Sequence, residues 1–326
     1  MSLVSAETLA ERSEKYAFSV EDVPFHLGVD RAKWAFPEHH APLFYTPAYR
    51  ELLSDEDRLV YNQVYACAIN ELFLFLEEEF LLPVLRGLER HGGRKHLPRE
   101  LGALLDTFAE EEEKHSEMFR KLNVLSDPER YAGSTFSFMR VPRQLRPVLD
   151  VMAHRPTFAM AWVWMGVLFE EKTVDYFQQY KVHARRAPDK PLDPLYEAVH
   201  KYHALDEVRH VQIDQHLVLA LYDKAPRAVR YANAAFMAAF LRAFTTPKRS
   251  QMRVLAELCR RRPHLAQHEE RFRREVLERD NLRAMHRALY GRRSLPKTFE
   301  MFDERPEMIV VKPALPGYDR RPAKAS

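Results

Sequence analysis

The sequence predicts an all-α protein made of long helices. Glycine is scarce, with 9 among 326 residues, so the frequent glycine turns of an all-β sandwich are missing. The 21 prolines fall mostly between long stretches that are rich in leucine, alanine, arginine and other charged residues. Such stretches favour helices, and prolines mark their ends.

Composition excludes several classes of protein. Lysine and arginine number 50 against 47 acidic residues, a net charge of +3, so no strong attraction to nucleic acid or acidic lipid is expected. Only two cysteines occur, Cys67 and Cys259, which rules out a disulfide framework or a cysteine-built zinc site. The first residues lack a signal-peptide pattern, and no apolar run approaches the roughly 18 residues of a membrane span. We therefore expect a soluble, cytoplasmic protein.

The chain divides into three expected parts. Residues 1–50 are rich in proline and aromatic residues and predict an irregular N-terminal arm that wraps around a core. Residues 51–290 hold the helical domain, and residues 291–326 predict an extended, proline-rich tail. Within that tail, residues 308–311 are an apolar run that could form one short strand.

Ser54 opens the first long helix. Three acidic residues follow it, as is typical of an N-cap and a first turn. Pro83 has no N–H to donate and should disturb the other end, while Pro156 suits the first turn of a later helix. The long helices are expected over about 54–82, 98–123, 156–180 and 193–222, and shorter helices over about 226–245, 250–261 and 264–289.

Each long helix bears acidic residues or histidines near its middle. The second contains Glu112 and His115 in a Glu-x-x-His pattern, and the fourth contains Glu207 and His210 in the same pattern. A step of three residues returns to within about 60° of the same helix face, so such a pair can grip one metal ion. The first and third helices supply glutamates at 77–79 and 170–171. One Glu from each of two helices plus Glu-x-x-His from two others is the ligand set of di-iron and di-manganese four-helix bundles.

The neighbouring sequence indicates that these groups are buried. Residues 66–82 run ACAINELFLFLEEEFLL, and residues 158–169 run FAMAWVWMGVLF. Carboxylates in such surroundings would cost several kcal/mol each if unpaired, and metal cations would offset that cost. Oxygen and nitrogen ligands suit iron, and manganese would suit them too.

His203 shares a helix stripe with Glu207 and His210, because it precedes them by four and seven residues. We expect it to be a further metal ligand, and a core histidine bonded to a backbone carbonyl is the alternative. Other histidines are expected to be surface or capping groups and not metal ligands: His91, His96, His154, His183, His200, His216, His264, His268 and His286.

With these residues in place, the chain resembles the p-aminobenzoate N-oxygenase family of di-iron oxygenases. Those are ferritin-like helical proteins of bacterial natural-product biosynthesis that oxidise amines to hydroxylamine, nitroso or nitro products. The resemblance covers roughly residues 45–245. It implies a ferritin-like four-helix bundle with additional C-terminal helices, and it is most specific at Glu112, His115, His203, Glu207 and His210.

The resemblance is less specific at the single glutamates. Glu77 suits the spacing to Glu112 better than Glu78 does. On the third helix we prefer Glu171, because the following Lys-Thr resembles a run in soluble acyl desaturases, although Glu170 has more apolar neighbours at helical spacing. The implied assignment gives one iron Glu77, Glu112 and His115, and the other Glu171, His203, Glu207 and His210, with carboxylates bridging.

Ligating imidazoles donate their second N–H to a carboxylate or carbonyl. Asp206 could accept from His115, and Glu111 could accept from His210. The ligand set implies that two reduced irons bind the co-substrate O₂ as a peroxo species, which the extra His203 would stabilise, and that this species attacks an amine. The expected partners are a small-molecule amine, an electron-donating reductase or ferredoxin, and a second copy in a homodimer.

The third helix could also line a substrate pocket, since Met160, Trp162, Trp164, Met165 and Phe169 lie around it.

Three other functions are alternatives to an N-oxygenase. One is a different di-iron activity, a hydroxylase or desaturase, and another is a non-enzymatic ferritin-like metal store. The third is nucleic-acid binding through residues 260–293, where eleven arginines face five acids; a solvated helix is the preferred interpretation of that stretch.

Overall fold

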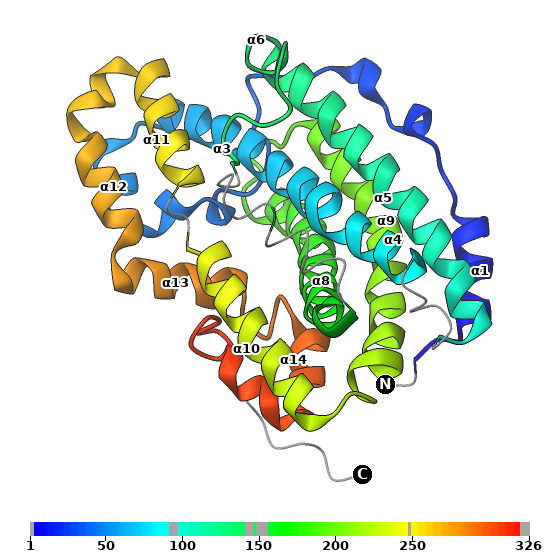
Figure 1. Cartoon of the computed structure of the whole chain (residues 1–326). Helices are drawn as coiled ribbons and strands as arrows, with labels where there is room; N and C mark the ends of the chain where they lie inside the picture. The colour runs from blue at the N-terminus through cyan, green and yellow to red at the C-terminus, as the bar shows by residue number, and fades with distance from the viewer. Residues whose placement is uncertain (1–2, 91–96, 141–146, 148–155, 247–248, 320–326) are drawn as a thin grey trace.

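The computed structural model describes residues 3–90, 97–140, 147, 156–246 and 249–319. This part of the chain is helical throughout apart from turns and one isolated bridge between Trp34 and Leu192, which confirms the predicted fold class. Four long helical segments form the bundle, and they lie side by side in Figure 1. They are α3 (Asp55–Leu76) with its continuation α4 (Leu82–Arg90), α5 (Arg99–Ser126), α8 (Pro156–Arg186) and α9 (Pro194–Leu217).

The first bundle helix begins where the sequence predicts and ends later. Ser54 Oγ accepts a hydrogen bond from the Asp57 N–H (3.2 Å), and the Asp57 carboxylate accepts one from the Ser54 N–H (3.1 Å). Pro83 does not end the helix. A π-helical turn, η5 (Glu77–Leu81), precedes it, and the Leu82 N–H donates to the Glu77 carbonyl five residues back. The wider turn accommodates the missing N–H of proline, and such turns often occur at functional sites.

Helix α9 is bounded in a similar way. Asp193 caps its start by accepting from the Tyr196 N–H at 2.9 Å, and Pro194 occupies the first position. Its other end passes into a second π-helical turn, η7 (Val218–Tyr222). Both π turns keep the polypeptide helical past the point where the α-helix ends.

Further helices cover the bundle. Helix α10 (Arg227–Phe244) packs on α8, and α11 (Ser250–Arg261) packs on α3 (Figure 1). The single helix expected over 264–289 is instead three elements, because Glu278 is extended and interrupts it. These are η8 (Pro263–His268), α12 (Glu269–Leu277) and α13 (Arg279–Leu289).

The N-terminal arm includes two helices, α1 (Ala6–Lys15) and α2 (Pro47–Leu52), joined by short 3₁₀ turns. Helix α1 packs against α5 and α9, and Phe36 and Leu43 of the arm are buried in the core. The arm therefore does cover the bundle. The division of the chain into arm, domain and tail stays a prediction.

The tail is not extended, so that expectation is wrong. It forms α14 (Pro296–Asp303) and the 3₁₀ helix η9 (Pro306–Val311), so residues 308–311 are not a strand. Each element has proline at its first position, where the missing N–H costs nothing. Four apolar side chains of these two helices are buried in one core cluster: Phe299, Phe302, Met308 and Val311.

One helical run, Asp55–Leu88, is long and apolar enough by composition to cross a membrane, so the expectation that no stretch approaches such a span is corrected. Its most apolar stretch is 56% buried inside the protein. It also bears two buried glutamates, Glu71 and Glu77. These features are those of the core helix of a soluble protein.

The apolar core consists of two clusters with buried polar groups between them. On α5, Phe108 belongs to the first cluster and Met118 to the second, and the intervening buried residues include Glu112 and His115. Helix α8 follows the same order, with Leu168 in the first cluster, Tyr176 in the second and Glu170 between them, and α9 runs the opposite way. The bundle therefore places one polar layer across its middle.

Glu71 shows how a buried carboxylate organises a neighbouring loop. It accepts hydrogen bonds from the Tyr131 hydroxyl (2.7 Å) and from the backbone N–H groups of Ser137 (2.7 Å), Phe138 (2.7 Å) and Met139 (2.6 Å). Four donors saturate its two oxygens. The loop that follows α6 (Pro128–Tyr131) is thereby held against α3.

We predict that Glu71→Gln lowers the free energy of unfolding by about 2 kcal/mol, because the amide NH₂ would face donors instead of accepting from them. Chemical denaturation measures the change. Glu117→Gln is the control, since Glu117 is half exposed and pairs with Lys121 on the surface; a change within about 0.5 kcal/mol is expected there. Equal losses of the free energy of unfolding in the two variants would contradict the role of Glu71 in holding this loop.

Candidate metal centre

Helices α5 and α9 face each other across the polar layer and bring their two Glu-x-x-His pairs together. One potential ligand atom from each of Glu112, His115, Glu207 and His210 lies within 4.8 Å of all the others, and all four residues are buried. A second such group combines Glu77, His115 and His203. Six of the seven predicted ligands therefore converge.

The Nδ1 atoms of two histidines point into this cluster. His210 Nδ1 lies 2.9 Å from Glu112 Oε1 and 3.2 Å from Glu207 Oε2. His115 Nδ1 lies 3.5 Å from Glu207 Oε1 and 3.7 Å from Glu112 Oε1. Each carboxylate thus faces histidines from both helices.

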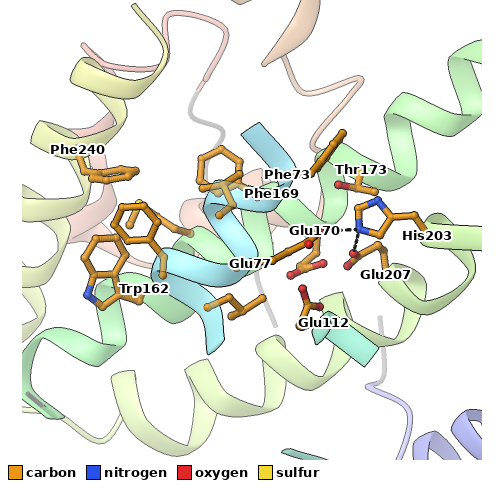
Figure 2. A pocket seen from close by; sticks show the side chains of 15 residues that line it. Phe73, Glu77, Glu112, Trp162, Phe169, Glu170, Thr173, His203, Glu207 and Phe240 are labelled. Atoms are coloured by element: carbon orange, nitrogen blue, oxygen red, sulfur yellow. Dashed lines mark ion pairs between the residues drawn. The ribbon is translucent and has the colours of Figure 1, made fainter. Parts of the chain in front are cut away.

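His203 lies on the side of the cluster next to α3. Its Nε2 contacts Glu207 Oε1 and is 3.4 Å from Glu77 Oε1, as Figure 2 shows. Its Nδ1 is buried and forms no hydrogen bond with the described residues. The alternative of a core histidine bonded to a backbone carbonyl therefore finds no support.

The structure does not bring Glu171 to the cluster, and the preference for it is corrected in favour of Glu170. Glu171 accepts hydrogen bonds from the backbone N–H groups of Lys297 and Thr298 (both 2.8 Å) and from the Thr298 hydroxyl (2.7 Å). It thus binds the start of α14, where an anion is favoured. Glu170, about 100° around the helix, lies 3.8 Å from His210 Nδ1 through its Oε2. The apolar neighbours of Glu170 were the sequence signal that favoured this register.

A second set of buried charges holds the two histidine rings. His115 Nε2 lies 3.0 Å from Asp206 Oδ2, and His210 Nε2 lies 2.7 Å from Glu111 Oε2. Both predicted partners are thereby confirmed. The roles of these carboxylates follow from geometry, since each imidazole directs one nitrogen inward and donates with the other.

Sequence reasoning missed the cations behind this set. Arg209 bridges Glu111 (2.5 Å) and Asp206, and Lys114 Nζ lies 2.7 Å from Asp206 Oδ2. The position of Arg209 three residues after Asp206 was the available signal. Ser116 was missed as well, and its hydroxyl donates to Glu77 Oε2 at 3.0 Å.

Asp214 is a further buried acid that the sequence did not single out. It lies one turn after His210, and neither of its oxygens forms a hydrogen bond with the described residues. It faces Gly166 so closely that a side chain at that position would overlap the carboxylate. Burial raises the pKa of Asp214 well above its usual range, and the charges of Glu112 and Glu207 raise it further.

The expectation for the remaining histidines holds in part. His183 and His216 bond backbone carbonyls, and His264 faces Asp57. His200 is instead buried one turn from His203 among aromatic rings, and His286 is buried against the Thr245 carbonyl (2.9 Å). His91, His96 and His154 lie outside the described residues.

The buried groups fit metal ions. Both oxygens of Glu112, Glu77 Oε1 and His115 Nδ1 are buried without a well-aligned hydrogen bond, although buried polar atoms are normally satisfied. Burial and the neighbouring Glu112 raise the pKa of Glu77 well above its usual range. Carboxylate oxygens with imidazole nitrogens are a donor set for iron or manganese. Divalent cations would satisfy these atoms and relieve the repulsion between the carboxylates.

A pocket opens beside the cluster. Glu77, Glu112, Glu170, His203 and Glu207 form its polar end, and aromatic and aliphatic side chains form the rest (Figure 2). Of the predicted pocket residues, Trp162, Met165 and Phe169 line it, and Met160 and Trp164 do not. The polar end and the apolar end suit a small organic molecule.

Comparison with protein families shows to which family the chain belongs. The family model described as P-aminobenzoate N-oxygenase AurF matches residues 4–291. The chain belongs to the p-aminobenzoate N-oxygenase family. A search of the curated proteins gave no significant match.

Membership in the p-aminobenzoate N-oxygenase family confirms the resemblance inferred from the sequence, and the match extends past residues 45–245 on both sides. The family is one of O₂-dependent di-iron N-oxygenases with a ferritin-like helical fold. The protein is therefore an enzyme, and the buried Glu/His cluster fits its di-iron site.

We predict opposite outcomes for the two neighbouring glutamates of α8. Glu170→Ala should weaken metal binding more than about tenfold, because its carboxylate faces the cluster. Glu171→Ala should leave metal binding unchanged and lower the free energy of unfolding by about 2 kcal/mol, because α14 loses its anchor. Metal titration and chemical denaturation measure the two quantities. Loss of metal in Glu171→Ala alone would reverse the assignment.

Metal affinity should rise with pH. Burial alone would lower the pKa of His115, but the carboxylates of Asp206, Glu112 and Glu207 raise it to about 10 in the metal-free protein. The ring is then protonated at neutral pH and must lose a proton before a metal can bind. Below about pH 10, affinity should therefore fall as pH falls, by up to about tenfold per pH unit for each proton displaced.

Proton release on adding Mn²⁺ to the metal-free protein, followed with a pH indicator, tests this prediction. Asp206→Asn is the matched variant, since it removes the carboxylate that lies 3.0 Å from His115 Nε2 and holds its proton, and it should release fewer protons. Affinity that does not change between about pH 6 and 8 would refute the prediction.

Proposed function

We propose that this enzyme binds two iron ions through Glu77, Glu112, His115, Glu170, His203, Glu207 and His210, and that it oxidises the nitrogen of a small amine held in the adjoining pocket. The observation that carries the proposal is the buried Glu/His cluster with unsatisfied oxygens at the end of an apolar cavity. Membership in the N-oxygenase family supports it.

Two of the carboxylates lie centrally among the residues that would hold the metal ions. Glu112 faces the histidines of both α5 and α9, and Glu207 also contacts His203. Glu77 and Glu170 lie to the sides, next to His203 and His210 respectively. The proposed ligands differ from those expected from the sequence in Glu170 replacing Glu171. In addition, His203 lies with Glu77 and His115, not only with the ligands expected for the other iron.

When bound in their reduced form, the irons would supply the electrons that activate O₂. The protein's own groups do the rest. Asp206 and Glu111 fix the rings of His115 and His210 through their Nε2 atoms, and Phe108 stacks on His210 with ring centroids 4.0 Å apart. These contacts hold the inward Nδ1 atoms in place and keep bulk water away.

Several finer expectations stay predictions. They are the oxygen intermediate expected from the ligand set, the choice of iron over manganese, and electron delivery by a reductase or ferredoxin. A role in natural-product biosynthesis, a cytoplasmic location and a homodimer belong with them.

Two alternatives find less support. A ferritin-like protein that only stores metal does not need an aromatic pocket beside its metal-binding residues. Nucleic-acid binding through residues 260–293 would need free cations, but several arginines there form ion pairs within the protein. They are Arg261 with Asp127 and Glu257, Arg262 with Asp57, Arg271 with Glu275, and Arg292 with Asp303.

We predict that protein loaded anaerobically with Fe(II) converts aniline-type amines to hydroxylamine or nitroso products on exposure to O₂. Mass spectrometry with ¹⁸O₂ should show label on the nitrogen of the product. Glu207→Ala should lose both bound iron and product, because Glu207 contacts three histidines of the cluster. Oxygen found only on carbon would favour the hydroxylase alternative.

A further inference from the structure

The far end of the pocket is aromatic. Phe80, Trp162 and Phe240 pack against one another there, with ring centroids 4.7 Å apart for Phe80 and Trp162 and 5.3 Å apart for the other two pairs. The Trp162 indole N–H forms no hydrogen bond with the described residues. A single neutral donor does not neutralise a charge, so this end favours uncharged groups.

Among the described residues, the walls between the two ends offer no cation. Apart from the expected metal ligands and Trp162, the only polar side chain among the lining residues that the structure describes is Thr173. Lys172, the next residue on α8, does not line the pocket and instead pairs with Asp175 at 2.7 Å. The remaining lining residues are Phe73, Leu76, Leu81, Met165, Gly166 and Phe169.

The metal end offers no net charge either. Four glutamates face it, namely Glu77, Glu112, Glu170 and Glu207, and the expected cations are two divalent ions. Four negative charges and four positive charges cancel, and metal-bound histidines are neutral. A substrate carboxylate would therefore enter a pocket without a counter-ion at either end.

We propose that the substrate is an amine whose remainder is apolar and uncharged, with its nitrogen at the Glu/His end and its alkyl or aryl part against Phe80, Trp162 and Phe240. This inference rests on the proposed function. It departs from the aminobenzoate in the family's description, because the described pocket holds nothing that would pair with a benzoate.

Two ligands of nearly equal shape test the proposal. In 4-isopropylaniline a neutral branched group replaces the planar carboxylate of 4-aminobenzoate. Calorimetry on the metal-loaded protein should show that 4-isopropylaniline binds at least about tenfold more tightly. Equal or tighter binding of 4-aminobenzoate would overturn the proposal.

A charge placed in the pocket should reverse this preference. Phe240 is only partly buried, so the guanidinium of Phe240→Arg can reach water when no ligand is bound. This variant should bind 4-aminobenzoate more tightly than the unmodified protein does, and 4-isopropylaniline more weakly. Ala239→Arg is the matched control, because Ala239 is the exposed neighbour on the same helix and does not line the pocket; its ratio of affinities should not change. If Phe240→Arg does not fold, the two ligands on the unmodified protein still decide.

Product analysis separates this proposal from the function on which it rests. If 4-isopropylaniline binds selectively but no amine is oxidised at nitrogen, the N-oxygenase proposal fails and the substrate class stands. If 4-aminobenzoate is the better bound and the better oxidised of the two, the substrate class fails and the N-oxygenase proposal stands.

Discussion

The burial of several carboxylates in one layer of a helical bundle is the constraint on which the rest of this structure depends. Glu77, Glu112, Glu170 and Glu207 come from four different helical segments and meet where water is excluded. Such a layer is unfavourable unless cations enter it. The histidines and their outer partners Asp206 and Glu111 set where those cations can bind, and Arg209 and Lys114 balance the outer carboxylates.

The apolar parts of the protein are arranged around this layer. One core cluster packs the C-terminal helices and the tail against α8, and the other packs the N-terminal arm and α11 against α3. Both clusters draw on segments far apart in the sequence, so the bundle is clamped on each side of its polar middle. The π-helical turn η5 (Glu77–Leu81) begins at this layer. Its first residue, Glu77, is the carboxylate that the first bundle helix places there.

The sequence was informative where a pattern repeats on one helix. The Glu-x-x-His pairs and His203 share helix stripes, so their convergence could be predicted from spacing, and Asp206 and Glu111 followed from the adjacent registers. The choice between Glu170 and Glu171 could not be made in this way. It depends on α14, whose formation rests on long-range contacts of Phe299 and Phe302 that no local pattern reveals. The tail was expected to be extended for the same reason. Its prolines are as typical of loops as of the first turn of a helix, and no local pattern distinguishes the two.

Helix α8 holds two consecutive glutamates with separate tasks: Glu170 faces the metal layer, and Glu171 grips the backbone of α14. Both residues lie in the same helix, so a rotation of α8 about its axis would move both carboxylates together. The start of α14, more than 120 residues downstream, therefore restrains the rotation of α8, the helix that carries the expected metal ligand Glu170. Shortening or tagging the protein beyond α13 would therefore be felt at the catalytic centre, far from the edited residues.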